Sequence, residues 1–238
     1  MFLIDGIKRQ LHRDIVADPR THGWVLNLYL NGERYPQTVC DYFQSEFAPN
    51  AELARNIERH EKDEHKHELI LGKAIRSLGQ QVIELPRIDI FNVIIRMFTP
   101  GTFHIVAGDP PEVRRDKLAN FMAHCHFLEK RVARSLEFQA DASSRAASPM
   151  AQKAVNAVLA DEARHVSYTI EAVRDLVTRQ RAREVLDAHC RAEARANLRF
   201  SHMQMRNFLS RFSDAVPRQR RLAYRICGAL MEGAERLM

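Results

Sequence analysis

The sequence predicts an all-α protein: a four-helix bundle with a long crossover between its second and third helices and additional helices after the fourth. Three observations support this prediction. Apolar residues recur at helical spacing in several long stretches, the nine Gly and nine Pro are few and clustered, and no useful length alternates as a strand does. The 238 residues suffice for one sizeable core, so we expect a single domain over 1–238.

The amino-acid composition limits the classes of protein to which the chain can belong. The 45% hydrophobic and 28% charged content is ordinary for a soluble globular chain. No apolar run approaches about 18 residues, and the first residues are too charged for a signal peptide, so we expect no membrane span. The four Cys are scattered, which fits a reducing compartment and predicts a cytoplasmic protein. The net charge of +6 permits an anionic partner without requiring one.

Periodicity and the positions of Gly and Pro place the elements along the chain. A short amphipathic helix is expected first, over 2–17. Four bundle helices and two further helices follow, at about 21–47, 51–78, 111–140, 149–178, 182–212 and 217–238. The irregular stretch 80–109 should contain one short apolar helix and form the crossover, which a bundle needs when its second and third helices run parallel.

Specific residues mark some of these boundaries. Gly79 can end the second bundle helix in the left-handed conformation. Ser148 precedes a proline, a pairing typical of the start of a helix. Within the first bundle helix, Asn31-Gly32 and Pro36 oppose regular helix, so we expect a kink there.

Two copies of one short pattern, Asp-Glu-x-x-His, lie on the second and fourth bundle helices. They begin at Asp63 and Asp161, 98 residues apart (63 to 161). Residues three apart share one face of a helix, so each Glu projects together with its His. The two pairs are Glu64 with His67 and Glu162 with His165. Short motifs also arise by chance, so position must support the match.

Each motif glutamate lies within the apolar stripe of its own helix, as Glu64 does between Ile57 and Leu71. A carboxylate that faces the core carries a large desolvation cost, which a metal ion can compensate. Glu33 in the first bundle helix and Glu129 in the third occupy the same kind of position. The apolar stripes therefore identify four carboxylates that face the core, one from each bundle helix.

Distance from the loops puts these four glutamates at matching heights. Helices joined by a short loop run antiparallel, so residues equally far from the loop lie level. Glu33 and Glu64 differ by about one residue in that distance, as do Glu129 and Glu162, which is about 1.5 Å of helix rise. Two other glutamates of these helices lie too close to their loops, namely Glu46 and Glu137.

Six candidate metal ligands result, namely Glu33, Glu64, His67, Glu129, Glu162 and His165. Four carboxylates and two imidazoles balance the charge of two divalent ions, and such oxygen and nitrogen ligands suit iron or manganese. The alternative interpretation is a set of hydrogen-bonded polar pairs in a helix interface. His126 is interpreted as a buried neighbour of the site rather than a ligand. Ordinary surface or packing roles are assigned to His60, His65, His124 and Tyr168.

The candidate ligand set resembles that of the ferritin-like di-iron carboxylate superfamily, in which two helices each supply Glu-x-x-His and two others each supply a Glu. The resemblance covers roughly residues 21–178. The second copy of the motif, Asp-Glu-Ala-Arg-His, is most similar to the oxygen-activating branches, and the departure is the irregular sequence around Glu33. The resemblance implies that Asp63 and Asp161 accept the ring N–H of the ligand histidines, which fixes their tautomer.

This resemblance implies a non-haem di-iron, or iron–manganese, oxidoreductase. Such an enzyme uses dioxygen or a peroxide to oxidise a small organic substrate, by hydroxylation, N-oxygenation or desaturation. The expected cofactor is a pair of iron ions, with manganese as an alternative at either position. A reductase or ferredoxin as electron donor and a second copy of the chain are the partners it implies. The substrate is expected beside the first and third bundle helices.

Three other functions fit the same residues. A ferroxidase, peroxidase or other iron-handling protein would have no cavity beside the metals. An oxygenase acting on a nucleic-acid base or a carrier-tethered substrate would gather basic residues at the mouth of the pocket, among them Arg191, Arg195, Arg199 and Arg206. A structural bundle would bind no metal at all.

Overall fold

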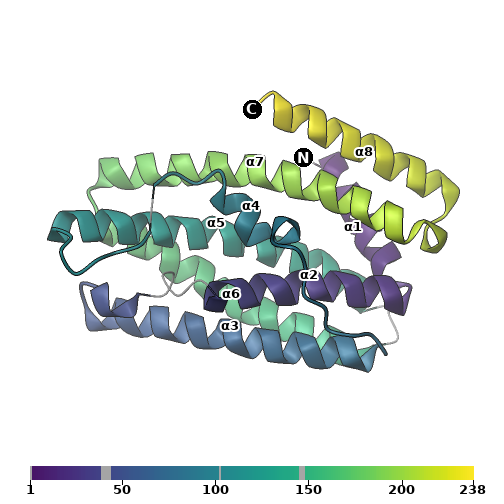
Figure 1. Ribbon diagram of the computed structural model, residues 1–238, viewed down its shortest axis with the longest axis horizontal. Coiled ribbons are helices and arrows are strands. Elements are labelled where there is room, and N and C mark those ends of the chain that lie inside the picture. Colours follow the sequence, from purple (N-terminus) through teal and green to yellow (C-terminus); the bar gives the residue numbers. More distant parts are fainter. Residues whose placement is uncertain (1, 39–43, 102, 145–147) are drawn as a thin grey trace.

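The helices of the computed structural model lie in layers, most of them running along its long axis (Figure 1). The structure describes residues 2–38, 44–101, 103–144 and 148–238, without the side chains of 2–5 and 35–38. In these ranges the chain is helical and contains no strand, which confirms the predicted all-α class. The helices are α1 (Phe2–Val16), α2 (Pro19–Thr38), α3 (Ala51–Ser77), α4 (Phe91–Arg96), α5 (Pro111–Ser143), α6 (Pro149–Leu176), α7 (Arg179–Arg211) and α8 (Arg218–Arg236).

The prediction that the first bundle helix reaches residue 47 is wrong. As described, α2 ends at Thr38, and Ser45–Phe47 forms a separate 3₁₀ turn. Positions 39–43, which the prediction also covered, lie outside the described residues. Helix α2 continues through Asn31 and Gly32, so these residues do not end it. The other predicted helices agree with the structure to within about one turn.

Side-chain caps and a glycine with positive φ form three of the helix ends. Asn50 caps α3, since its side chain accepts a hydrogen bond from the backbone N–H of Leu53. Gly79 follows the end of α3 with φ of +71°, a conformation that costs glycine little. Ser148 caps α6 by accepting from the backbone N–H of Ala151. The helix end predicted at Gly79 and the helix start predicted at Ser148 are confirmed.

Helix packing leaves a polar zone between two apolar clusters. Helix α3 packs against α2 and α6, and α6 packs against α5, while α1 and α7 cover α5 and α8 covers α7. On α3, Leu53 and Ile57 belong to one cluster, whereas Leu71 and Ile75 belong to another. The segment between them, 60–67, is therefore held at mid-height, with apolar packing on both sides.

The crossover between α3 and α5 is fastened to α2 by two buried asparagines. Asn27 accepts from the backbone N–H of Ile83 at 2.9 Å and donates to the carbonyl of Gln81 at 3.1 Å. Asn31 accepts from the N–H of Leu85 at 3.0 Å and donates to the carbonyl of Ile83 at 2.9 Å. One turn of α2 thus hydrogen-bonds an extended segment, which gives Asn31 a structural role inside the helix.

Among the described residues, no helix combines the length and the apolar character that crossing a membrane requires.

We expect Asn31→Ala to destabilise the fold by about 2 kcal/mol, or roughly 4–8 °C in the midpoint temperature of unfolding. The change leaves the N–H of Leu85 and the carbonyl of Ile83 without their side-chain partner. Thermal unfolding followed by circular dichroism measures the effect. Asn156→Ala, at an exposed position of α6, is the matched control and should shift the midpoint by less than about 1 °C. Equal midpoints for both variants would contradict this account.

Candidate metal centre

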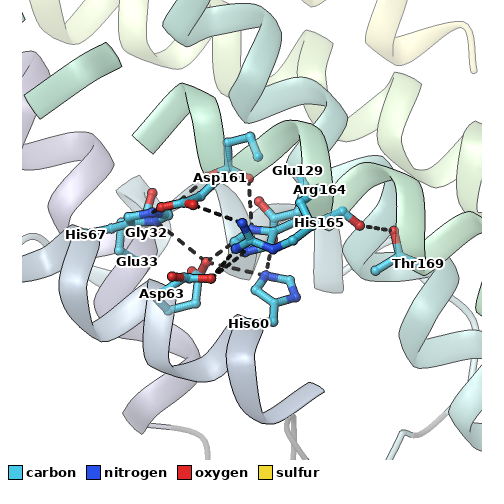
Figure 2. Close-up of polar contacts among 12 residues, drawn as sticks. Gly32, Glu33, His60, Asp63, His67, Glu129, Asp161, Arg164, His165 and Thr169 are labelled. Carbon is cyan, nitrogen blue, oxygen red and sulfur yellow. Dashed lines mark hydrogen bonds and ion pairs between the residues drawn. The ribbon is translucent and has the colours of Figure 1, made fainter. Parts of the chain in front are cut away.

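Seven histidines and glutamates from four helices meet in the polar zone between the apolar clusters. Figure 2 labels Glu33, His60, His67, Glu129 and His165 among them. All seven side chains are buried. They form two groups, and within each group the possible ligand atoms lie within 4.8 Å of one another. One group contains Glu33, Glu64, His67 and Glu162, and the other contains His60, Glu129 and His165. The structure therefore brings together all six predicted ligands and adds His60.

The first group joins α2, α3 and α6. Nδ1 of His67 lies 3.1 Å from Oε2 of Glu33 and 4.0 Å from Oε1 of Glu162. The same nitrogen lies 3.9 Å from Oε1 of Glu64. Glu33, the candidate with the least regular sequence around it, reaches this group because α2 is continuous through Asn31-Gly32.

The second group contains a residue to which sequence analysis gave no role in the site. His60 is buried, so it is not a surface residue, and it packs directly among the candidate ligands. Its ring stacks on that of His165 with centroids 3.7 Å apart, and its Nε2 lies 3.5 Å from Oε1 of Glu129. The signal was present in the sequence: positions 57, 60, 64, 67 and 71 alternate in steps of three and four, as one buried face of a helix does.

Glu64 and Glu162 lie between the two groups. Oε1 of Glu64 is 3.4 Å from Nε2 of His60 and 3.8 Å from Nδ1 of His165, in addition to its contact with His67. Glu162 directs Oε2 to Nδ1 of His165 at 3.3 Å and Oε1 towards His67. These two carboxylates are thus within reach of both groups, the arrangement expected of bridging ligands.

The two motif aspartates contact the histidines in a crossed pattern. Asp161 on α6 lies 3.2 Å from Nε2 of His67 on α3, and Asp63 on α3 lies 3.5 Å from Nε2 of His165 on α6. Each aspartate therefore faces the histidine of the other motif rather than its own. For His67, a proton on Nε2 shared with Asp161 would leave the lone pair of Nδ1 directed at the glutamates.

Two basic residues, Lys66 and Arg164, contact both of these aspartates, and sequence analysis gave them no role. Lys66 donates to Asp63 at 3.0 Å and also to Asp161. Arg164 donates to Asp161 at 3.0 Å and also to Asp63 (Figure 2). Burial alone would raise the pKa of Asp161, but hydrogen bonds from Lys66, Arg164 and His67 hold it well below its usual range. Both residues directly precede the motif histidine, a regularity that was visible in the sequence.

The central carboxylates lack such compensation. Burial, followed by the charges of the neighbouring glutamates, raises the pKa of Glu64 and of Glu162 well above the usual range. Oε1 of each is buried with no hydrogen-bond partner among the described residues. Buried acceptors of this kind are rare unless something positive meets them. Two divalent cations would balance four carboxylates, so the residues present fit a pair of metal ions.

Other residues considered from the sequence lie outside the two groups. Glu46 and Glu137 are exposed, as is His65. His126 is buried, but its Nδ1 faces the backbone carbonyl of Val166 at 3.0 Å. Tyr168, interpreted as a packing residue, also forms a hydrogen bond of 2.7 Å between its hydroxyl and Nδ1 of His60.

A cavity of about 150 Å³ opens beside the glutamates. Residues of α1, α2, α4, α5 and α7 line it, together with Glu64 of α3, and its lining includes the three glutamates Glu33, Glu64 and Glu129. Most of its wall is apolar, with aromatic side chains from all five helices except α1. Its position between α2 and α5 is the side on which the sequence predicted a substrate.

Comparisons with known proteins assign no family to the chain. No family model matches it, and neither the search of curated proteins nor that of solved structures gave a match. The functional argument therefore rests on the geometry of the centre and the cavity.

We expect Glu162→Gln to stabilise the metal-free protein at pH 7 and to weaken its stabilisation by Fe(II) or Mn(II). A carboxyl with a raised folded-state pKa favours folding while it is protonated, and it loses that advantage as pH rises above the unfolded value near 4.5. The neutral amide avoids this loss but is a poorer ligand. A gain of about 1 kcal/mol corresponds to about 2–4 °C.

Scanning calorimetry with a chelator and with added metal measures both effects. Glu61→Gln, at an exposed position of α3, should change neither. A midpoint that falls by the same amount with and without metal would show that Glu162 is an ordinary structural residue.

Proposed function

We propose that the chain is a ferritin-like di-iron, or iron–manganese, oxidoreductase in which α2, α3, α5 and α6 form the four-helix bundle. The enzyme would use dioxygen or a peroxide to oxidise a small organic substrate. One observation carries the proposal: four glutamates and three histidines converge beside an apolar cavity, and three of those glutamates line it. A metal centre beside a cavity is what an organic substrate requires.

The proposed ligands divide between two metal ions. Glu33 and His67 would bind one ion, and His60, Glu129 and His165 would bind the other. Glu64 and Glu162 lie within reach of both groups, so they would bridge the pair. Asp63 and Asp161 would hold the histidine rings with Nδ1 facing the metals, which also raises their basicity as ligands.

A reduced iron pair supplies the binding and reductive splitting of dioxygen. Hydroxylation then balances as RH + O₂ + 2 e⁻ + 2 H⁺ → ROH + H₂O, so a reductase or ferredoxin must deliver two electrons per turnover. The protein's own contribution is positional. The apolar wall of the cavity excludes water from the reacting end, and the bundle helices hold the ligands from four directions.

The cavity weighs against the alternative of a ferroxidase or another iron-handling protein, which needs no space for an organic molecule. The arginines that would favour a nucleic-acid or carrier-tethered substrate also lie elsewhere. None of the four is among the described residues that line the cavity. Arg206 pairs with Glu232, while Arg195 and Arg199 lie over the ring of Phe98. A small free substrate is the better match.

Metal loading tests the proposal directly. Protein incubated anaerobically with Fe(II) and then desalted should retain about two metal ions per chain, measured by mass spectrometry of the metal content. Glu162→Ala should lower this to about one or fewer, because a shared ligand is lost. Glu137→Ala, at an exposed position of α5, is the control and should retain two. Native protein that retains neither iron nor manganese would refute the metalloenzyme and leave a structural bundle.

The role of His60 needs its own variant. We expect His60→Ala to retain about one iron per chain, because the group around Glu33 and His67 remains intact. His65→Ala removes an exposed histidine from the same helix and should retain both ions. Two tightly bound ions in His60→Ala would reduce the ligand set to the six residues predicted from the sequence.

A further inference from the structure

Each of the three histidines in the candidate centre has one ring nitrogen near the glutamates and the other near a different kind of neighbour. For His67 and His165 the outer nitrogen is Nε2, and its neighbour is an aspartate. For His60 the outer nitrogen is Nδ1, which lies 2.7 Å from the hydroxyl oxygen of Tyr168. By position, Tyr168 is the counterpart of the two aspartates.

Tyr168 also follows the crossed pattern between α3 and α6. Asp161 of α6 and Asp63 of α3 each face a histidine of the opposite helix. Tyr168 of α6 contacts His60 of α3 in the same way. Tyr168 follows His165 by three residues, so the two share one face of α6, and the ring of His60 stacks on that of His165. All three histidines therefore meet their outer partners across the same helix interface.

The contact between Tyr168 and His60 is enclosed by the protein. The side chain of His60 is 1% exposed and that of Tyr168 is 9% exposed. Tyr168 belongs to the apolar cluster that also contains Ile57 and Cys125. Burial raises the pKa of Tyr168 well above its usual range, so the hydroxyl keeps its proton. A buried phenol needs a hydrogen-bond partner, and His60 supplies it.

The inner nitrogen of His60 faces the proposed metal ions. Its Nε2 lies 3.4 Å from Oε1 of Glu64 and 3.5 Å from Oε1 of Glu129. A neutral histidine that binds a cation through Nε2 carries its proton on Nδ1. His60 would donate that proton to the hydroxyl oxygen of Tyr168. Such a bond fixes both the tautomer and the orientation of a ligand ring.

A hydroxyl differs from a carboxylate in what it can offer the ring. A carboxylate only accepts hydrogen bonds, whereas a hydroxyl both donates and accepts. When the proton of His60 lies on Nε2, beside the glutamates, Tyr168 can donate to Nδ1. When the proton lies on Nδ1, Tyr168 can accept it. The same contact therefore holds His60 in place both before and after a cation binds.

We propose that Tyr168 is a positioning residue that keeps Nε2 of His60 directed at Glu129, so that His60 can serve as a metal ligand. This inference rests on the proposed metal centre. It gives Tyr168 a share in the affinity for one of the two ions. Among the described residues, no hydrogen bond or ion pair joins Tyr168 to Glu33 or His67, so the other ion should not depend on it.

Chelator competition, followed by the visible absorption of Co(II), measures the affinity for each ion. We expect native protein to bind two Co(II) ions and Tyr168→Phe to bind one of them about tenfold more weakly, with the other unchanged within about twofold. Phe retains the ring, and the unfolding midpoint in chelator checks that the variant is folded. Tyr29→Phe is the matched control, because its hydroxyl bonds Ser135 rather than a candidate ligand, and it should bind both ions as the native protein does.

A second background shows whether the effect passes through His60. His60→Ala should bind one Co(II) ion. Adding Tyr168→Phe to His60→Ala should leave the affinity for that ion unchanged within about twofold, because the ring that Tyr168 positions is already absent. A residue that only supports the fold would weaken metal binding in both backgrounds.

The outcomes separate the role of Tyr168 from that of the metal centre. Native affinity for both ions in Tyr168→Phe, or an equal loss for both, would overturn the positioning role and leave the metalloenzyme standing. A further loss on adding Tyr168→Phe to His60→Ala would also overturn it, because the hydroxyl would then act through another residue. Native protein that binds no metal would refute the oxidoreductase and, with it, the ligand role of His60.

Discussion

Burial of four carboxylates at one level of the fold is the constraint on which the rest of the structure depends. The cost is clearest for Glu64 and Glu162, because burial and the neighbouring carboxylates raise the pKa of both side chains. The packing nevertheless holds all four in place, with apolar clusters above and below on α3. Neutral residues would avoid this cost, which supports the proposed role of the glutamates as metal ligands.

The layer of aspartates and basic residues shows how this arrangement is kept rigid. Asp63 and Asp161 each contact the histidine of the opposite helix, and Lys66 and Arg164 each hold both aspartates. The interactions that orient the candidate ligands are therefore also the interactions that join α3 to α6. The two motifs form one interface, in which neither is complete without the other.

Sequence analysis predicted the elements and six of the seven converging residues, because helical periodicity determines which side chains face inward. It missed what depends on contacts between helices. Asn31 looked like a helix breaker under local rules, but its amide hydrogen-bonds a crossover segment more than 50 residues away, and this favours continuous helix. Lys66 and Arg164 looked like solvated charges, because their partners lie on another helix. His60 was different, since its own spacing along α3 placed it on the buried face.

The helices α1, α4 and α7, which carry none of the candidate ligands, form part of the cavity wall. The seven candidate ligands all come from α2, α3, α5 and α6, but the cavity is closed by α1, α4 and α7, which the sequence placed before, within and after the bundle. The candidate ligands therefore depend on α2, α3, α5 and α6, whereas much of the cavity wall depends on the helices packed around them. We expect substitutions at the lining positions of α1, α4 or α7 to change what the cavity accepts while leaving the candidate ligands in place.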